Sequence, residues 1–233
     1  MISIILPCLN EGENLKILVP EIVRELKRKD YEIIIIDDNS KDQTDLIVKN
    51  LKKRYKIKYL KRTNERGLAS AVIAGFNLSK GNFIIVMDAD YSHPPSVILE
   101  IIKNLNSNSD IVVASRYIEG GGVVKWQFLR KLVSVFATFL AKPLVKVKDP
   151  LAGFFGIKRE VLKNSKLNPL GFKILLEILV KCNYKKVIEI PFIFRERHSG
   201  VSKANMKIYF EYNLHLLKLY FYKLKQIFRR ILK

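Results

Sequence analysis

Short runs of β-branched and other apolar residues alternate with longer segments of helical periodicity in the first half of the chain. The runs predict strands at Ile2 to Leu6, Glu32 to Ile36, Ile57 to Leu60, Phe83 to Met87 and Ile111 to Ala114. The intervening segments predict helices near Asn14 to Lys29, Thr44 to Tyr55, Gly67 to Ser79 and Pro95 to Leu105. Because nearly every strand position is apolar, we expect an α/β fold with a mostly parallel sheet covered by helices.

The pattern changes after Ser115, where two amphipathic segments are predicted. The uncharged run from Leu132 to Ala141 is ten residues long, too short to cross a bilayer. The second segment, 203–233, interleaves Lys and Arg with large aromatic and aliphatic residues, which is typical of a helix lying in a membrane interface. A surface helix packed on the core would show the same pattern. We expect an α/β domain at 1–202, including the amphipathic segment 125–147, and a basic amphipathic helix at 203–233.

Net charge narrows the range of partners. The 233 residues contain 42 Lys and Arg against 22 Asp and Glu, a formal charge of +20. Nucleic acid, a surface of acidic lipids and a phosphate-rich substrate are the three anionic partners that this excess favours. The two cysteines, Cys8 and Cys182, lie far apart in apolar settings, and no signal peptide precedes the first strand. Both features favour reduced thiols and a cytoplasmic location.

The sharpest candidate site is Asp88-Ala89-Asp90, where a buried strand ends in two carboxylates. Two hard oxygen donors at this spacing suit Mg²⁺ or Mn²⁺ bridging a diphosphate. Capping of the helix after Pro95 is the alternative, but a cap needs one carboxylate. The pair therefore favours a metal site.

Other strand ends carry polar or charged residues as well. Asp37, Asp38 and Ser40 follow the second strand, where they could bind a nucleobase or cap the next helix, and Glu11 follows the first. Four arginines are candidates for binding phosphate: Arg66, Arg116, Arg130 and Arg197. Lys203 is a further candidate close to Arg197 in the sequence. No glycine-rich dinucleotide motif, Walker loop, catalytic triad or zinc spacing is present.

Taken in order, these motifs resemble inverting family 2 glycosyltransferases of GT-A (Rossmann-like) fold. The first half carries Pro7-x-x-Asn10-Glu11, Asp37-Asp38-x-Ser40-x-Asp42-x-Thr44, Arg66-Gly67-x-x-x-Ala71 and Asp88-x-Asp90. The second half is similar to dolichol-phosphate mannose synthases in His93-Pro94-Pro95, Ser115-Arg116-Tyr117, Arg130-Lys131-Leu132-x-Ser134, Asp149-Pro150-x-x-Gly153-Phe154-Phe155, Asn168-Pro169-x-Gly171-Phe172-Lys173 and Arg197-x-x-Gly200-x-Ser202-Lys203. The resemblance covers nearly the whole chain.

This resemblance implies transfer of mannose from GDP-mannose to dolichyl or polyprenyl phosphate, with inversion. It implies a nucleotide-sugar site made by Pro7, Asn10, Glu11, Ile36, Asp38, Arg66, Gly67, Met87, Asp88, Ala89, Asp90, Arg197 and Lys203. The acceptor phosphate would be bound by Arg116, Arg130 and Ser134, and Mg²⁺ or Mn²⁺ by Asp88, Asp90 and Ser92. Asp90, Arg116 and Arg130 are the expected catalytic residues.

The implied chemistry needs no general base, because a phosphate monoester is already an anionic nucleophile near neutral pH. We therefore expect Asp149 to shape the acceptor loop. The chain departs from the family pattern at two positions: Ser92 stands where Gln is frequent, and Leu9 where Tyr is usual. The implied location is peripheral, on the cytoplasmic face of a membrane. The resemblance leaves open whether a separate membrane-anchoring subunit is needed.

Two alternatives stand beside this hypothesis. The first keeps the mechanism but uses a UDP-sugar, transferring glucose or N-acetylglucosamine. The second is a basic nucleic-acid-binding protein, suggested by the charge and the basic aromatic C-terminus. The acidic strand ends argue against the second alternative, because they would repel a phosphate backbone. We expect no nucleic-acid partner.

Overall fold

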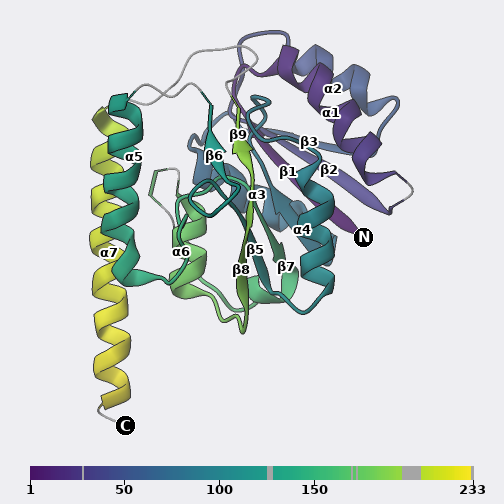
Figure 1. The fold of residues 1–233 in the computed structure, drawn as a ribbon. Helices are drawn as coiled ribbons and strands as arrows, with labels where there is room; N and C mark the ends of the chain where they lie inside the picture. Colours follow the sequence, from purple (N-terminus) through teal and green to yellow (C-terminus); the bar gives the residue numbers. More distant parts are fainter. Residues whose placement is uncertain (28, 125–127, 169, 172, 196–205, 232–233) are drawn as a thin grey trace.

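A computed structural model describes residues 1–27, 29–124, 128–168, 170–171, 173–195 and 206–231. A seven-stranded sheet in the order β3-β2-β1-β4-β7-β5-β8 forms its centre (Figure 1). Its strands are β1 (Ile2–Cys8), β2 (Tyr31–Asp37), β3 (Ile57–Lys61), β4 (Phe83–Val86), β5 (Ile111–Ser115), β7 (Phe155–Lys158) and β8 (Val187–Pro191). Two short strands, β6 (Gly122–Val123) and β9 (Ile193–Phe194), pair separately. This mostly parallel sheet with flanking helices confirms the predicted α/β class.

Strand β7 is antiparallel to both of its neighbours, β4 and β5, whereas the other pairs of the large sheet are parallel. The carboxyl ends of β1, β2, β4, β5 and β8 therefore share one edge with the beginning of β7. Ligands of open α/β sheets bind at this edge. The loop that precedes Phe155 consequently faces the same edge as the polar residues that follow the parallel strands.

The alternation of side chains along each strand divides the core into two layers. Ile5, Ile34 and Val86 face one layer with helices α3 (Leu68–Leu78), α6 (Ile174–Lys181) and the buried face of α7 (Met206–Ile231). Ile4 and Ile33 face the other with α1 (Gly12–Leu26), α2 (Thr44–Lys52) and α4 (Val97–Asn106). Both faces are covered, which explains the continuous apolar runs in the sequence.

The five predicted strands and four predicted helices all occur, with ends that differ by at most three residues. Strands β7 and β8 and helix α6 were not predicted. The expected division after residue 202 stays a prediction, because residues 196–205 lie outside the described residues.

Helices α5 (Phe128–Ala141) and α7 lie side by side at one side of the sheet, next to α6 (Figure 1). Tyr212 and Tyr220 of α7 donate to the carbonyls of Ala137 and Leu140 of α5, at 2.6 and 2.8 Å. A short 3-10 helix (Lys142–Leu144) follows α5, and another (Arg159–Leu162) follows β7.

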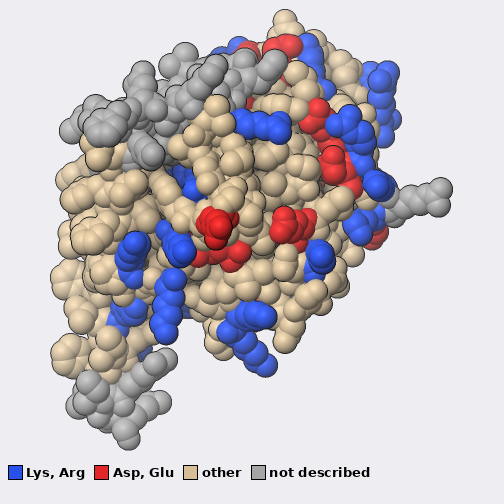
Figure 2. Space-filling model, in the orientation of Figure 1, with Lys and Arg blue, Asp and Glu red and all other residues tan. Residues whose placement is uncertain are grey.

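The outward faces of α5 and α7 are rich in large apolar side chains, which we call the apolar strip. Among the described residues it holds eleven of the eighteen exposed large hydrophobic residues: Leu132, Val135, Phe136, Phe139, Phe210, Leu214, Leu217, Phe221, Leu224, Ile227 and Phe228. Figure 2 shows this side of the molecule as mostly uncharged surface with Lys and Arg beside it. Within the described ranges, no helix combines the length and apolar character that a membrane crossing requires.

Candidate functional site at the carboxyl edge of the sheet

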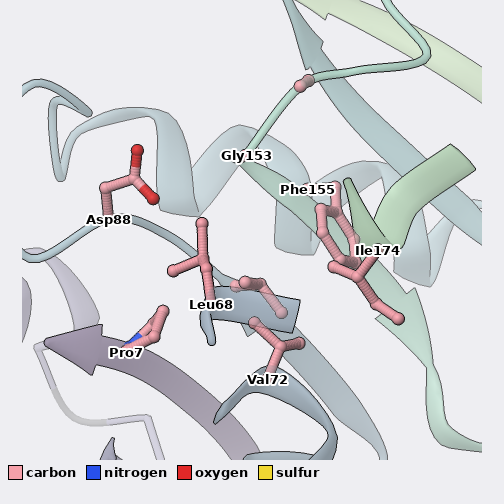
Figure 3. A pocket seen from close by; sticks show the side chains of 9 residues that line it. Pro7, Leu68, Val72, Asp88, Gly153, Phe155 and Ile174 are labelled. Carbon is pink, nitrogen blue, oxygen red and sulfur yellow. The ribbon is translucent and has the colours of Figure 1, made fainter. Parts of the chain in front are cut away.

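A pocket opens at the carboxyl edge of the sheet, where β1, β4, α3 and α6 meet the loop before β7. Figure 3 shows Asp88 on one side, Phe155 and Ile174 on the other, and Leu68 between them. The lining residues are Pro7, Leu68, Val72, Val86, Asp88, Ala152, Gly153, Phe155 and Ile174. Pro7 and Asp88, two residues of the predicted nucleotide-sugar site, therefore share one pocket.

The backbone of Asp88 is fixed by His93. The N–H of Asp88 donates to Nδ1 of His93 at 2.9 Å, and Nε2 of the same ring lies 3.7 Å from the Asp88 carboxylate. His93 is buried, stacked on Phe154 with ring centroids 5.0 Å apart. Burial lowers the pKa of His93 despite the opposing charges of Asp88 and Asp90. A neutral ring that accepts at Nδ1 carries its proton on Nε2, toward the carboxylate.

Asp90 is held by Ser92. Its Oδ1 accepts from the backbone N–H of Ser92 at 3.1 Å and from the Ser92 hydroxyl at 2.5 Å, and both residues are buried. The Ser92 hydroxyl thus acts as a donor to Asp90 in this structure rather than as an outward-facing ligand. No group of three or more His, Cys, Asp and Glu side chains able to hold a metal ion occurs among the described residues.

Asp38 lies against a buried arginine that sequence reasoning missed. Nε and Nη2 of Arg62 donate to Oδ1 of Asp38, the former at 2.7 Å, and the N–H of Gly67 donates to Oδ2 at 2.8 Å. Arg62 also donates to the Gly67 carbonyl at 3.0 Å. Gly67 has a φ of 135°, a conformation that L side chains rarely adopt. This network fixes the turn that leads into α3.

The turns after β1 and β2 are joined to each other. The N–H of Asn10 donates to the Ser40 hydroxyl at 2.8 Å, and the Asn10 side chain accepts from the N–H of Lys41 at 2.8 Å. Glu11 is buried and accepts from Asn14 at 2.5 Å. The predicted Asn10, Glu11 and Asp38 are therefore neighbours across two strand ends.

Arg116 forms a buried ion pair with Asp149. Nε and Nη2 of Arg116 each donate to one oxygen of Asp149 at 2.8 Å, and the N–H of Arg116 donates at 3.0 Å. The side chains are 8% and 0% exposed. Burial opposes the charge of Arg116, but the hydrogen bonds to Asp149 outweigh it and raise the pKa of Arg116. Glu189 accepts from the backbone N–H groups of Lys148 and Asp149, at 2.7 and 3.0 Å, which fixes the loop on β8.

Tyr117 connects Arg116 to the predicted Ser134. The guanidinium carbon of Arg116 lies 5.2 Å from the centroid of the Tyr117 ring, and the Tyr117 hydroxyl is 2.8 Å from that of Ser134 on α5. Arg130 precedes Ser134 by one turn of α5, so the two positions share a face of that helix. Tyr117 therefore contacts both Arg116 and Ser134, whereas only the backbone position of Arg130, one turn before Ser134, is described.

The remaining predicted residues have different placements. Ile36, Met87 and Ala89 have buried side chains, so only their backbones could contact a ligand. Arg66 is exposed beside the Gly67 turn. Arg197 and Lys203 lie outside the described residues, as does the side chain of Arg130.

His93 and Phe194 lie between the carboxylate pair and the Arg116 ion pair: the two ring centroids are 5.6 Å apart, and the Arg116 guanidinium carbon is 6.0 Å from the Phe194 centroid. The charges of Asp88, Asp90, Arg116 and Asp149 all act on the pKa of His93, so the carboxylate pair and the Arg116 ion pair lie within electrostatic reach of one imidazole. The charge of Asp88 also acts on Arg116 directly. Cys8, at the end of β1, is buried and burial raises its pKa, which does not favour a nucleophilic thiol.

Comparison with known proteins identifies the family. The model for glycosyl transferase family 2 matches residues 3–165. A dolichol-phosphate mannosyltransferase of Pyrococcus furiosus is 45% identical over 94% of this chain, which spans 63% of that relative, less than two thirds. A dolichol-phosphate mannosyltransferase of Saccharomyces cerevisiae is 36% identical over 95% of this chain and 87% of its own length.

A solved structure supports the fold. Glucosyl-3-phosphoglycerate synthase from Mycobacterium tuberculosis, solved with Mn²⁺, UDP-glucose and glycerol 3-phosphate, superposes with a TM-score of 0.69 at 15% identity, covering 96% of this chain and 79% of that one. This likeness confirms the expected GT-A architecture. By the match of the family model over residues 3–165, the chain belongs to glycosyl transferase family 2.

Proposed function

We propose that this chain transfers mannose from GDP-mannose to the phosphate of dolichol or another polyprenol, with inversion at the anomeric carbon. The observation that carries the proposal is that Asp88 contacts His93, whose ring centroid lies 5.6 Å from that of Phe194, while the Arg116 guanidinium carbon lies 6.0 Å from the same Phe194 centroid. It places groups suited to a nucleotide diphosphate next to groups suited to a phosphate monoester. The names of the two relatives support mannose and dolichol phosphate as the substrates.

The proposed reaction forms one bond and breaks one. A phosphate oxygen of the lipid forms the new bond to the anomeric carbon of mannose, while the bond from that carbon to the diphosphate breaks and GDP leaves with the electron pair. Since the nucleophile is anionic near neutral pH, the chain must align it and neutralise charge rather than remove a proton. Arg116, Arg130 and Ser134 would hold the acceptor phosphate, and Asp149 fixes the orientation of the Arg116 guanidinium.

The carboxylates of Asp88 and Asp90 fit a divalent cation that is completed by substrate. They supply hard oxygen donors, which Mg²⁺ and Mn²⁺ prefer, and Asp88 lines the pocket. Since no cluster of three or more ligating side chains is found among the described residues, we infer that phosphate oxygens of the nucleotide complete the site. The bound cation would stabilise the negative charge that develops on the leaving diphosphate. His93 and Ser92 would hold the two carboxylates in position.

We also propose that the apolar strip lies in the interface of a membrane, with the protein peripheral on the cytoplasmic face. Apolar side chains of this number on two adjacent helices suit the boundary between headgroups and acyl chains. Exposed basic residues near the strip, Lys142, Lys146, Lys218 and Lys225 among them, would contact acidic headgroups. The lipid acceptor could then present its phosphate while its chain stays in the bilayer.

A transfer assay tests the proposal. The full chain is incubated with dolichyl phosphate in vesicles, Mn²⁺ or Mg²⁺, and GDP-mannose, UDP-glucose or UDP-N-acetylglucosamine, and the lipid product is measured. We expect product from GDP-mannose alone. If product forms only from a UDP-sugar, the proposed mechanism stands and the proposed donor is wrong. No product from any donor, together with tight and salt-dependent oligonucleotide binding, would favour the nucleic-acid alternative.

A further inference from the structure

The described residues of the 168–174 segment, namely 168, 170–171 and 173–174, contact helices α6 and α7 on one side and the pocket on the other. The end of the segment, Ile174, lines the pocket, and Lys173 donates to the carbonyl of Leu151 in the loop before β7 at 2.9 Å. Closer to its middle, the carbonyl of Gly171 accepts from the N–H of Ala69 in the first turn of α3 at 3.4 Å. The described part of this segment therefore contacts two sides of the pocket.

Two buried side chains hold the same segment from behind. His215 of α7 accepts the N–H of Leu170 at Nδ1, at 3.0 Å, and Glu177 of α6 accepts the N–H of Asn168 at 2.9 Å. Both side chains are buried, although Glu and His carry polar groups that are costly to bury. Gly171, with a φ of 73°, lies so close to α7 that a Cβ there would be 3.4 Å from that of Glu211.

Packing alone does not explain why polar side chains, His215 and Glu177, occupy these two buried positions. Lys181 donates to the same oxygen of Glu177 that Asn168 contacts, whereas Oε2 of Glu177 and Nε2 of His215 have no hydrogen-bond partner among the described residues. Burial lowers the pKa of His215, the charge of Glu177 opposes this shift, and Lys181 and Lys218 reinforce it. The imidazole is therefore neutral near pH 7 and can accept at Nδ1 only with its proton on Nε2. An apolar pair would fill the same space at lower cost, so the polar groups indicate a specific task.

We propose that His215 and Glu177 are positioning residues that hold the 168–174 segment against the pocket, so that α7 takes part in shaping the nucleotide-sugar site. The proposal rests on the proposed function of that pocket. Neither side chain lines the pocket, and both act through backbone N–H groups of the segment. The helix that carries the apolar strip on its outer face thus determines the pocket wall through its inner face.

Three variants of α7 separate positioning from simple packing. His215→Leu removes the acceptor and keeps an apolar side chain. His215→Asn keeps an acceptor, because its amide oxygen can occupy the place of Nδ1. Tyr212→Phe is the matched control, since it removes a hydrogen bond from α7 to α5 and leaves the segment untouched.

Two readouts are measured on the full chain: amide hydrogen exchange at Leu170 and Ala69, and KM and kcat with GDP-mannose. For His215→Leu we expect the Leu170 amide to exchange about tenfold faster and KM to rise about fivefold, with kcat changed by less than about twofold. His215→Asn should stay within about twofold of the wild type in both readouts, as should Tyr212→Phe. If His215→Leu does not fold, Glu177→Leu, which removes the acceptor of the Asn168 N–H, replaces it, with about threefold faster exchange at Asn168 and a smaller rise in KM.

The outcomes distinguish this inference from the proposed function. Unchanged exchange at Leu170 in His215→Leu, or faster exchange without a change in KM, would overturn the positioning role. A KM that rises equally in Tyr212→Phe would reduce the effect to general loosening of α7. If the wild type uses no nucleotide sugar at all, the proposed function fails. Hydrogen exchange at the Leu170 and Ala69 amides then tests by itself whether His215 and Glu177 position the segment.

Discussion

The guanidinium group of Arg62 donates from two nitrogens to one oxygen of Asp38, while the N–H of Gly67 donates to the other oxygen. The side chains of Arg62 and Asp38 are 5% and 10% exposed. The pair joins the end of β2 to the residue after β3 and to the turn before α3. Asp38, which the sequence places in the nucleotide-sugar site, is thus also part of the network that fixes the turn before α3.

Replacing Arg62 by Met should lower the free energy of unfolding by about 3–5 kcal/mol, because Asp38 would stay buried without a counter-charge. Urea denaturation of the two proteins measures the difference. Arg66→Met is the control: Arg66 is exposed, so its loss should change stability by less than about 0.5 kcal/mol. Equal losses of stability in the two variants would contradict the structural role of Arg62.

Replacing Asp88 by Asn should weaken metal-dependent binding of GDP-mannose by at least about tenfold, or about 1.4 kcal/mol, because a carboxylate is lost from a two-carboxylate site. Titration calorimetry with and without Mn²⁺ measures the change. Asp45→Asn serves as the control, since Asp45 lies on the surface of α2 in an ion pair with Lys49. An undiminished effect of Mn²⁺ on Asp88→Asn would remove Asp88 from the metal site.

The double replacement Phe139→Glu and Phe221→Glu should reduce binding to vesicles that contain acidic lipids by at least about tenfold, since each buried Phe contributes about 2 kcal/mol. Both rings are more than 60% exposed on the apolar strip. Flotation of protein with vesicles gives the bound fraction. Leu46→Glu is the matched control, because Leu46 is 58% exposed on α2, away from the strip. A similar loss in the control would indicate that added negative charge, and not the strip, governs binding.

Acid should destabilise the fold partly through Asp110. Burial raises the pKa of this carboxyl, but the N–H groups of Lys185 and Lys186 and the amine of Lys158 outweigh burial and lower it from the ordinary 3.8. Because the folded-state pKa lies below the unfolded one, the stabilisation is fully present above about pH 5 and is lost as pH falls through 3.8 toward the folded value.

Thermal unfolding of Asp110→Asn between pH 7 and pH 3 tests this prediction. The variant should have a lower Tm at pH 7 and a smaller decrease in Tm on acidification than the wild type. Asp30→Asn is the control, because the Asp30 side chain is 62% exposed and its ion pair with Lys56 is long, at 3.5 Å. An Asp110→Asn protein with the same pH profile as the wild type would exclude a contribution from Asp110.

Strands β1, β2, β4 and β5 were predictable because each is mainly a run of buried apolar residues bounded by polar ones. Strand β7 was not predictable from the sequence. Phe155–Lys158 has only four residues, and its first residue belongs to a motif that was interpreted as part of the candidate site. The antiparallel direction of β7 depends on pairing with β4 and β5, which lie far away in the sequence. Local patterns do not contain that information.

In the site, sequence reasoning found the acidic strand ends but not the groups that hold them. Arg62 follows Lys61 at the end of β3 and looks like an exposed surface cation; its burial shows only in three dimensions. His215 and Glu177 likewise lie in helical segments where polar residues are common. Tyr117 belonged to a recognised motif, but its hydroxyl contact with Ser134 requires α5 to be placed beside β5.

The position of β7 determines the order in which the molecule can be completed during synthesis. Strand β4 ends at Val86, and β7, which pairs with one of its edges, begins at Phe155, 69 residues later. A ribosome adds those residues in about 3–14 s, during which that edge of β4 has no strand beside it. Since the loop before β7 lines the pocket, a nascent chain can form the turns that follow β1 and β2 well before it has a pocket. An unpaired strand edge of this kind is prone to aggregation. The nascent chain should therefore depend on chaperones most strongly between the synthesis of β4 and that of β7.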